Sequence, residues 1–241
     1  MSAAQAVGAT LNFNTNNGNS NTPVLTALKN SQTCGTWNYE WSYNTSTSEF
    51  FCNAAVVFAS GDLIRTNGSA VTIRANSGIT LSNNSVGTSS NRVNLATNSG
   101  AMQISGAVSV FGDIANGSGT ATIQGTSTTN RMTITGQVTS AGTLNMSNVN
   151  ITGALQSGSG AVSLTNVNLT GNMQWSGNIT LSNGDITGSL TTTGTLDASN
   201  GSSVTAAVSA NNGITSNGTV FGSSVSTSNG GLNITEGSVA G

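Results

Sequence analysis

The sequence predicts an all-β fold, a three-sided parallel β-solenoid, and three observations lead to that prediction. The chain is polar without being charged, since 5% of its 241 residues are charged and 35% are hydrophobic. Its apolar residues alternate with polar ones, which is the two-residue period of a strand with one buried face. From Asn130 onward these alternations recur with a period of about 17 to 18 residues, which fits one coil of a solenoid with three short sides.

The composition favours a folded chain over a disordered one. Disordered chains usually combine low hydrophobicity with a high net charge, whereas this chain has a net charge of −2 and apolar residues throughout. Solubility then depends on Asn, Ser, Thr and Gly, because charged residues usually make up about a quarter of a soluble protein.

Three sets of apolar positions define the repeat, and we expect each set to form one side of the coil. The first set, called here the anchor column, is Ile134, Ile151, Leu169, Ile186 and Val204. Four residues further on lies the second column, Val138, Leu155, Met173, Leu190 and Val208. The third set consists of pairs separated by one polar residue, Leu144/Met146, Val162/Leu164, Ile179/Leu181 and Leu196/Ala198.

Glycine and asparagine mark the corners between these sides, because both tolerate the left-handed backbone that tight corners need. The expected corner positions are Gly136, Gly153, Gly171 and Gly188, and the dipeptides Ser147-Asn148, Thr165-Asn166, Ser182-Asn183 and Ser199-Asn200. Stacked Asn side chains can hydrogen-bond from coil to coil.

Upstream of Asn130 the pattern continues less regularly. The stretch from Ile104 to Val108 matches the anchor motif but precedes Ile134 by much more than one period, so we expect at least one coil of different length there. We predict a solenoid domain at residues 59–241, with about ten coils, and an N-terminal cap segment at residues 1–58.

The cap segment holds an aromatic strand with Trp37, Tyr39, Trp41 and Tyr43 at every second position. We expect 37–43 and the chain from Glu49 onward to form a hairpin with a turn at 44–48. Two interpretations stay open, because both require the same alternation. The four rings either fill the core of a cap or form a ligand-binding platform for sugar rings.

Two cysteines, Cys34 and Cys52, bracket this hairpin. In a secreted protein they would form a disulfide that ties the ends of the hairpin, while the alternative is two free buried thiols. We predict the disulfide. The N-terminus lacks the basic and apolar regions of a signal peptide, so export is inferred from composition and cysteines.

A further surface feature is an outward column of threonines beside the anchor column: Thr135, Thr152, Thr170, Thr187 and Thr205. A flat threonine grid at strand spacing resembles the ice-binding face of solenoid antifreeze proteins. The neighbouring column is mixed and includes Asp185, and Thr is in any case favoured on exposed strands.

Few residues could perform catalysis. There is no histidine, which excludes Ser-His-Asp and Cys-His nucleophile systems and histidine metal sites. A glycosidase needs two carboxylates about 5 to 10 Å apart, and the candidate pairs are Asp185 with Asp197 and Glu40 with Glu49. We interpret both pairs as solvated surface and predict no enzyme, cofactor or metal.

The charges also argue against two classes of partner. Beyond Arg131 the chain contains no Lys or Arg, which argues against nucleic-acid binding because phosphate contacts depend on those residues. No apolar run approaches the roughly 20 residues of a membrane-spanning helix.

Runs such as NVNITGALQSGSGAVSLTNVNLTGNM resemble the Asn/Thr/Gly-rich solenoids of secreted bacterial surface proteins, including adhesins, mannose-sensitive pilus biogenesis proteins and phage tail fibres. The resemblance covers residues 60–241 and implies a secreted or cell-surface location in bacteria or on phage. We therefore expect a non-catalytic structural or adhesive stalk that binds surface glycans or a host or prey surface, as a homo-oligomer or an end-to-end fibre. The alternatives are an ice-binding solenoid and a carbohydrate-active β-helix enzyme.

Overall fold

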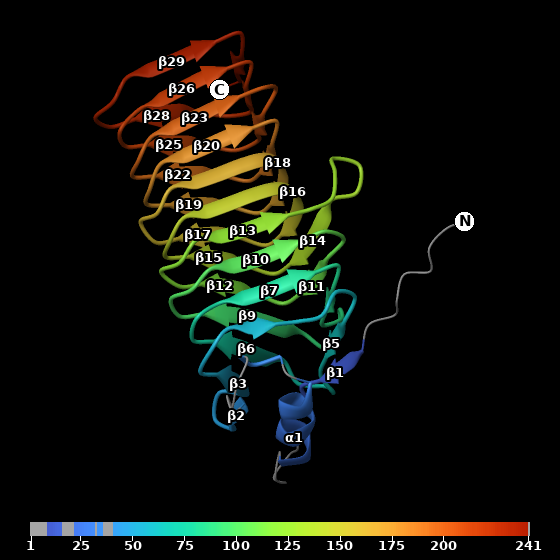
Figure 1. Cartoon of the computed structure of the whole chain (residues 1–241). Helices are drawn as coiled ribbons and strands as arrows, with labels where there is room; N and C mark the ends of the chain where they lie inside the picture. The colour runs from blue at the N-terminus through green and yellow to red at the C-terminus, as the bar shows by residue number, and fades with distance from the viewer. Residues whose placement is uncertain (1–8, 16–21, 32, 36–40, 241) are drawn as a thin grey trace.

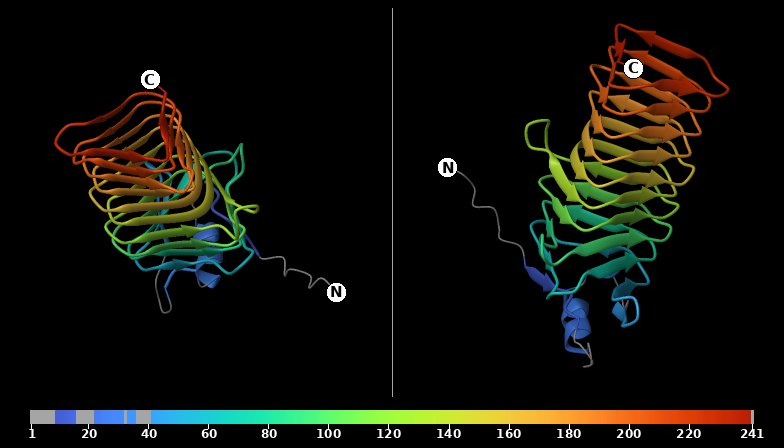
Figure 2. Two further views of the ribbon diagram at one scale, coloured as in Figure 1. Left: turned by 90° about the horizontal axis from the view of Figure 1, so that it is seen from above. Right: turned by 180° about the vertical axis from the view of Figure 1, so that it is seen from behind.

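The computed structural model describes residues 9–15, 22–31, 33–35 and 41–240. It confirms the predicted fold class: about ten coils stack into a three-sided β-solenoid with parallel ladders between them. Figure 1 shows the coils rising from the N-terminal end to the C-terminal end, and the left view of Figure 2 looks along the stack.

Each coil contributes one strand to each of three sides, which we number in chain order. The first side contains β3 (Glu49–Cys52), β6 (Val71–Ala75), β9 (Val93–Thr97), β12 (Ile114–Asn116), β15 (Val138–Ser140), β17 (Leu155–Ser157), β19 (Met173–Trp175), β22 (Leu190–Thr192), β25 (Val208–Ala210) and β28 (Val225–Thr227).

The second and third sides form one sheet that bends at a corner. The second side contains β4 (Val56–Val57), β7 (Ile79–Ser82), β10 (Met102–Ser105), β13 (Ala121–Gln124), the first halves of β16 (Leu144–Thr152) and β18 (Val162–Thr170), β20 (Ile179–Ser182), β23 (Leu196–Ser199), β26 (Ile214–Asn217) and β29 (Leu232–Thr235). The third side contains β5 (Leu63–Arg65), β8 (Ser85–Val86), β11 (Ser109–Phe111), β14 (Met132–Thr135), the second halves of β16 and β18, β21 (Asp185–Thr187), β24 (Ser203–Val204), β27 (Val220–Phe221) and β30 (Ser238–Val239).

The predicted columns are real columns of the core. In the anchor column Ile134 pairs with Ile151, and the register continues through Leu169 and Ile186 to Val204. The second column runs in register from Val138 to Val208 on the first side. The side chains of both columns are buried, so like residues stack on like residues along a continuous interior.

The corners use the residues that the sequence indicates. Asn148, Asn166, Asn183 and Asn200 all have left-handed backbone, with φ between 50° and 58°. The side-chain amide of Asn166 donates to Asn148 Oδ1 at 3.1 Å, and that of Asn183 donates to Asn166 Oδ1 at 2.6 Å. At the next corner a Cβ on Gly171 would overlap the Gly153 carbonyl oxygen of the preceding coil, so only glycine fits.

The assignment of Ile104 to the anchor column is wrong. Ile104 pairs with Ile123 on the second side, and the anchor residue that pairs with Ile134 is Val110. The error arises because every side shows the same two-residue alternation.

The expectation of coils of different length upstream is correct. On the first side, register partners up to Val138 stand further apart in sequence than those beyond it. The pair Ile114 and Val138 shows the wide spacing, and the pair Leu155 and Met173 shows the regular one. The early coils are therefore longer than the late ones.

The N-terminal end of the stack is covered by elements that are not coils. On the third side β1 (Thr10–Asn12) pairs parallel with β5, and on the first side β2 (Trp41–Asn44) pairs antiparallel with β3. On the second side Cys34 forms a single antiparallel bridge with Val56. Helix α1 (Thr22–Asn30) lies beyond the first coil (Figure 1) and buries Leu28.

Strand β3 belongs to both parts, since it pairs antiparallel with β2 and parallel with β6. The second strand of the predicted hairpin is therefore also the first strand of the stack. The division into a cap segment at 1–58 and a solenoid domain at 59–241 stays a prediction.

Candidate functional site

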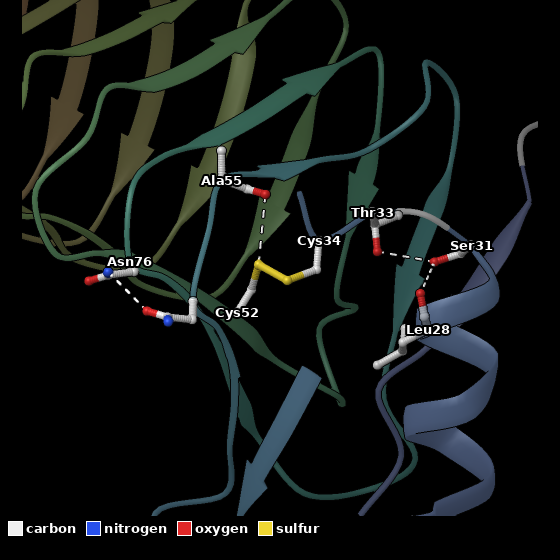
Figure 3. Close-up of a disulfide and its surroundings, with 8 residues drawn as sticks. Leu28, Ser31, Thr33, Cys34, Cys52, Ala55 and Asn76 are labelled. Carbon is white, nitrogen blue, oxygen red and sulfur yellow. Dashed lines mark hydrogen bonds between the residues drawn. A yellow bond between two sulfur atoms is a disulfide. The ribbon is translucent and has the colours of Figure 1, made fainter. Parts of the chain in front are cut away.

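The predicted disulfide is present and joins Cys34 to Cys52. Figure 3 shows it beside the chain that leads from β3 to β4, and the short segment 33–35 runs antiparallel to the start of β4. The backbone of Val57 donates to the Thr33 carbonyl at 3.0 Å, and that of Gly35 donates to the Ala55 carbonyl at 2.9 Å. The disulfide thus fastens a short strand along the free edge of β4.

The aromatic strand is described in its second half, and Trp37 and Tyr39 lie outside the described residues. Trp41 is 4% exposed, and its ring packs edge-on against Phe13 at 5.4 Å between centroids. Tyr43 is half-buried with its ring 4.6 Å from that of Phe50. A ring as buried as Trp41 has no free face for a sugar, so this half of the strand favours the interpretation as a cap core.

Phe13 is the centre of this cluster. Its ring also contacts Phe50 at 5.2 Å and Phe58 at 6.3 Å, and the side chain is fully buried. Phe13 was not predicted from the sequence, although it stands two residues after Leu11 in the alternation of a strand. Helix α1 was missed as well, although Pro23 follows Thr22 at its start, an arrangement typical of a helix N-terminus.

The threonine column faces outward as expected. Thr135, Thr152, Thr170 and Thr187 are register partners on the third side. Thr205 continues the column beyond β24, and all five are exposed or half-buried. The neighbouring outward positions are Thr133, Asn150, Asn168, Asp185 and Ser203. Threonine therefore fills one file on this side and does not extend to a two-dimensional grid.

The candidate acidic residues that the structure describes lie on different sides of the solenoid or contact other residues. Asp185 is on the third side, where it accepts a hydrogen bond from Ser203 Oγ at 2.6 Å, while Asp197 is on the second side in β23. Glu49 pairs with Arg74 at 2.8 Å, and Glu40 lies outside the described residues. Asp185 and Asp197 therefore lie on different sides of the coil, and the pairing of Glu40 with Glu49 lies outside the described residues.

One carboxylate is buried, and its contacts explain why. Asp62 is 4% exposed and accepts hydrogen bonds from the backbone of Ala9 and of Ala59, each at 3.0 Å. It joins the chain before β1 to the corner between β4 and β5, which is a structural role. Nearby, burial lowers the pKa of the Arg65 guanidinium, which donates to the Ser85 carbonyl at 2.7 Å.

The described part of the molecule includes a hollow near each end of the stack. One hollow, of about 480 Å³, borders three successive coils near the C-terminal end and is lined by Asp197, Thr215, Asn233 and the starts of the strands around them. Another, of about 250 Å³, lies between β1 and α1 and is mainly apolar. Among the described residues no group of three Cys, Asp or Glu side chains could hold a metal ion. Neither hollow has the paired carboxylates of a glycosidase.

Trp175 fills the interior. It is 2% exposed, and its indole nitrogen donates to the Gly160 carbonyl at 2.6 Å. Its side chain therefore packs inside the solenoid and offers no exposed face to a ligand.

Comparisons of the chain with protein-family models, curated proteins and solved structures found no match. The helix found in the described part of the chain is too short to cross a membrane. The features of the molecule that point to a function are therefore the fold, the disulfide and the chemistry of the surface.

Proposed function

We propose that this chain is a non-catalytic, extracellular structural module, a rigid stalk of the kind found in surface fibres and adhesins. The observation that supports this most is the uninterrupted parallel ladder through about ten coils. At about 4.8 Å per coil the stack spans roughly 50 Å. Because each coil is hydrogen-bonded to both neighbours and packed on a continuous core, the stack resists bending.

The disulfide supports an extracellular location, since disulfides persist in oxidising compartments. The outward surface supports a structural role, because it consists mainly of Thr, Ser and Asn, carries few charges, and in its described part has no group of three metal-binding side chains. Such a surface is soluble and chemically inert. Glycan adhesion would require contacts other than Trp41, which is buried.

The stalk is tested by measuring its stiffness. Dyes attached at Ser42→Cys, near the N-terminal end, and at Asn233→Cys, in the last coil, report the distance between the ends by single-molecule energy transfer. We expect one narrow distance distribution that is unchanged by salt, because the ladder depends on backbone hydrogen bonds and apolar packing. A broad or salt-dependent distribution would show a flexible chain and overturn the proposal.

A glycan array distinguishes the stalk from an adhesin. We expect no saccharide to bind to the folded protein. Binding that disappears in a folded Trp37→Ala variant would place a sugar site in the aromatic strand. Binding that disappears in Thr152→Ala with Thr170→Ala would place it on the threonine column, and an ice-recrystallisation assay of that variant tests the ice-binding alternative.

A further inference from the structure

Strand β1, which covers the third side of the first coil, is paired along one edge with β5. The backbone of Phe13 donates to the Arg65 carbonyl at 2.7 Å, and the Ala9 carbonyl accepts a bond from β5 at 2.9 Å. These bonds belong to alternate residues, so the backbone groups of Thr10 and Asn12 point away from β5. No strand in the described part of the chain pairs with that second edge. Unpaired strand edges are sites at which another strand adds.

An apolar hollow of about 250 Å³ lies between β1 and helix α1. Its lining consists of the three residues of β1 and of Pro23, Val24, Ala27 and Leu28 of α1, none of which is charged. Figure 1 and the right view of Figure 2 show β1 and α1 side by side at this end of the stack. Sites for small molecules usually measure about 300 to 1,000 Å³. The hollow is smaller, so it suits an apolar side chain better than a whole small molecule.

Leu11 connects the hollow with the core of the solenoid. Its register partner is Ile64, and the same file continues through Val86 and Val110 to Ile134 in the anchor column. Leu11 is half-buried and lines the hollow, whereas Ile64 is fully buried. A further apolar side chain stacked on Leu11 would therefore continue the anchor column into the hollow.

We propose that the groove between β1 and α1 binds an extended peptide segment of a partner protein, which adds to β1 as a further strand. The backbone groups of Thr10 and Asn12 bond to the backbone of the peptide, and the hollow accepts one of its apolar side chains. Sheet edges recognise peptides through this combination of main-chain bonds and side-chain pockets. Because the lining is uncharged, the peptide is uncharged as well and carries apolar residues at alternate positions. The proposal is independent of the stiffness of the stalk.

A single strand fits this groove, whereas a whole coil does not. A coil stacked on the first coil would have to pair on all three sides. On the first side β2 already pairs with β3, and on the second side Cys34 already bridges to Val56 in β4. Helix α1 also lies beyond the first coil (Figure 1). The occupant is therefore one extended segment and not a coil of a second copy.

Titration with a synthetic peptide tests the groove. The probe is a labelled peptide of residues 165–171, Thr-Asn-Val-Asn-Leu-Thr-Gly, because its Leu169 belongs to the anchor column in the stack. By fluorescence anisotropy we expect saturable binding to the wild-type protein. Ala27→Trp fills the hollow and should weaken binding at least about tenfold. Thr26→Trp is the matched control and should bind as the wild type does, since Thr26 is exposed on α1 and does not line the hollow.

A proline substitution tests the strand pairing itself. Asn12→Pro removes the N–H that points away from β5, and an edge strand accepts proline at such a position. Asn12→Ala keeps that N–H and is its control. We expect a loss of at least about tenfold in affinity for the proline variant and none for the alanine variant. In hydrogen exchange of the wild-type protein saturated with peptide, the Asn12 amide should slow, while that of Phe13, already bonded to Arg65, should not change.

Three results would each overturn the proposal: no saturable binding of the probe below about 1 mM, equal affinities of the wild type and Ala27→Trp, or an Asn12 amide that exchanges at the same rate with and without peptide. Circular dichroism shows whether each variant is folded. If Asn12→Pro unfolds, Ala27→Trp and the exchange of the wild-type protein decide the outcome. A failed titration together with a narrow end-to-end distance would refute the peptide groove and leave the stalk standing.

Discussion

The first four coils and the last six build the same sides from sequences of different regularity. On the first side, register partners in the last six coils keep the regular spacing of the repeat, as in Leu155 with Met173. In the first four coils and at their junction with the fifth, the register partners stand further apart in sequence. Leu95 and Ile114 are nevertheless register partners of a parallel ladder, as Leu155 and Met173 are. The coil length therefore varies while the stacked sides do not.

The difference is accommodated at the corners. Gln124 pairs with Ser147 and Met132 pairs with Val149, so one residue, Asn148, turns the corner where the preceding coil uses the chain from Gly125 to Arg131. The extra residues project from the stack as a loop before β14 (Figure 1). An irregular coil is thus a regular coil with an insertion, as expected where each repeat contacts its neighbours through its sides.

Truncation of a core side chain should lower the free energy of unfolding more than any other change. The loss should be equal in the irregular coils and the regular coils. Leu95→Ala and Leu190→Ala remove fully buried side chains from the same column, one in the irregular coils and one in the regular coils. We expect each to lower the free energy of unfolding by about 3 kcal/mol. Urea denaturation monitored by native-state hydrogen exchange gives the loss for each region. A much smaller loss for Leu95 would mean that the irregular coils are less tightly packed.

Removing the disulfide should affect one region only. Replacing Cys34 and Cys52 by Ser opens a link across a sequence separation of 18, which corresponds to about 3 kcal/mol in the loop-closure estimate. Because coils interact with their neighbours alone, hydrogen exchange should accelerate in the first coils and stay unchanged in the last six. The reference for the double Ser variant is the wild-type protein with its disulfide intact. Uniform acceleration along the chain would show that the stack unfolds as a single unit.

Much of the fold could be predicted because the same buried and corner positions recur in every regular coil. The column from Val138 to Val208 and the left-handed Asn corners recur in successive coils, so chance is excluded by repetition. Interactions that occur at one place in the stack leave no repeated pattern in the sequence. The buried hydrogen bonds that join Thr97, Asn116 and Ser140 occur once and follow from the packing of three coils.

The candidate site was less predictable for a related reason. Alternation places Trp41 and Tyr43 on one face of a strand but does not say what covers that face. The decisive neighbour of Trp41 is Phe13, which lies far away in sequence and reaches it through the pairing of β1 with β5. The burial of an aromatic strand is a tertiary property, so the cap core and the binding platform both stayed open at the level of sequence.

Deletion of residues 126–131 should change the free energy of unfolding less than the substitutions above, although it removes more of the sequence. This deletion would join Gly125 to Met132 and convert the coil to the regular length. The hydrogen bonds of the loop are largely internal, as between the Ser127 backbone and the Asn130 carbonyl. We therefore expect the free energy of unfolding to change by less than about 1 kcal/mol in urea denaturation, since loop length contributes only weakly to stability.

The matched control is a deletion of equal length that removes a side, residues 155–160, which include β17. That variant loses Leu155 from the second column and interrupts the ladder between β15 and β19, so it should fail to form a continuous stack. Comparable damage from the two deletions would contradict the view that insertions at corners are neutral. The loop would then have to support the coils beside it, and the irregular region would owe its stability to its corners as well as to its sides.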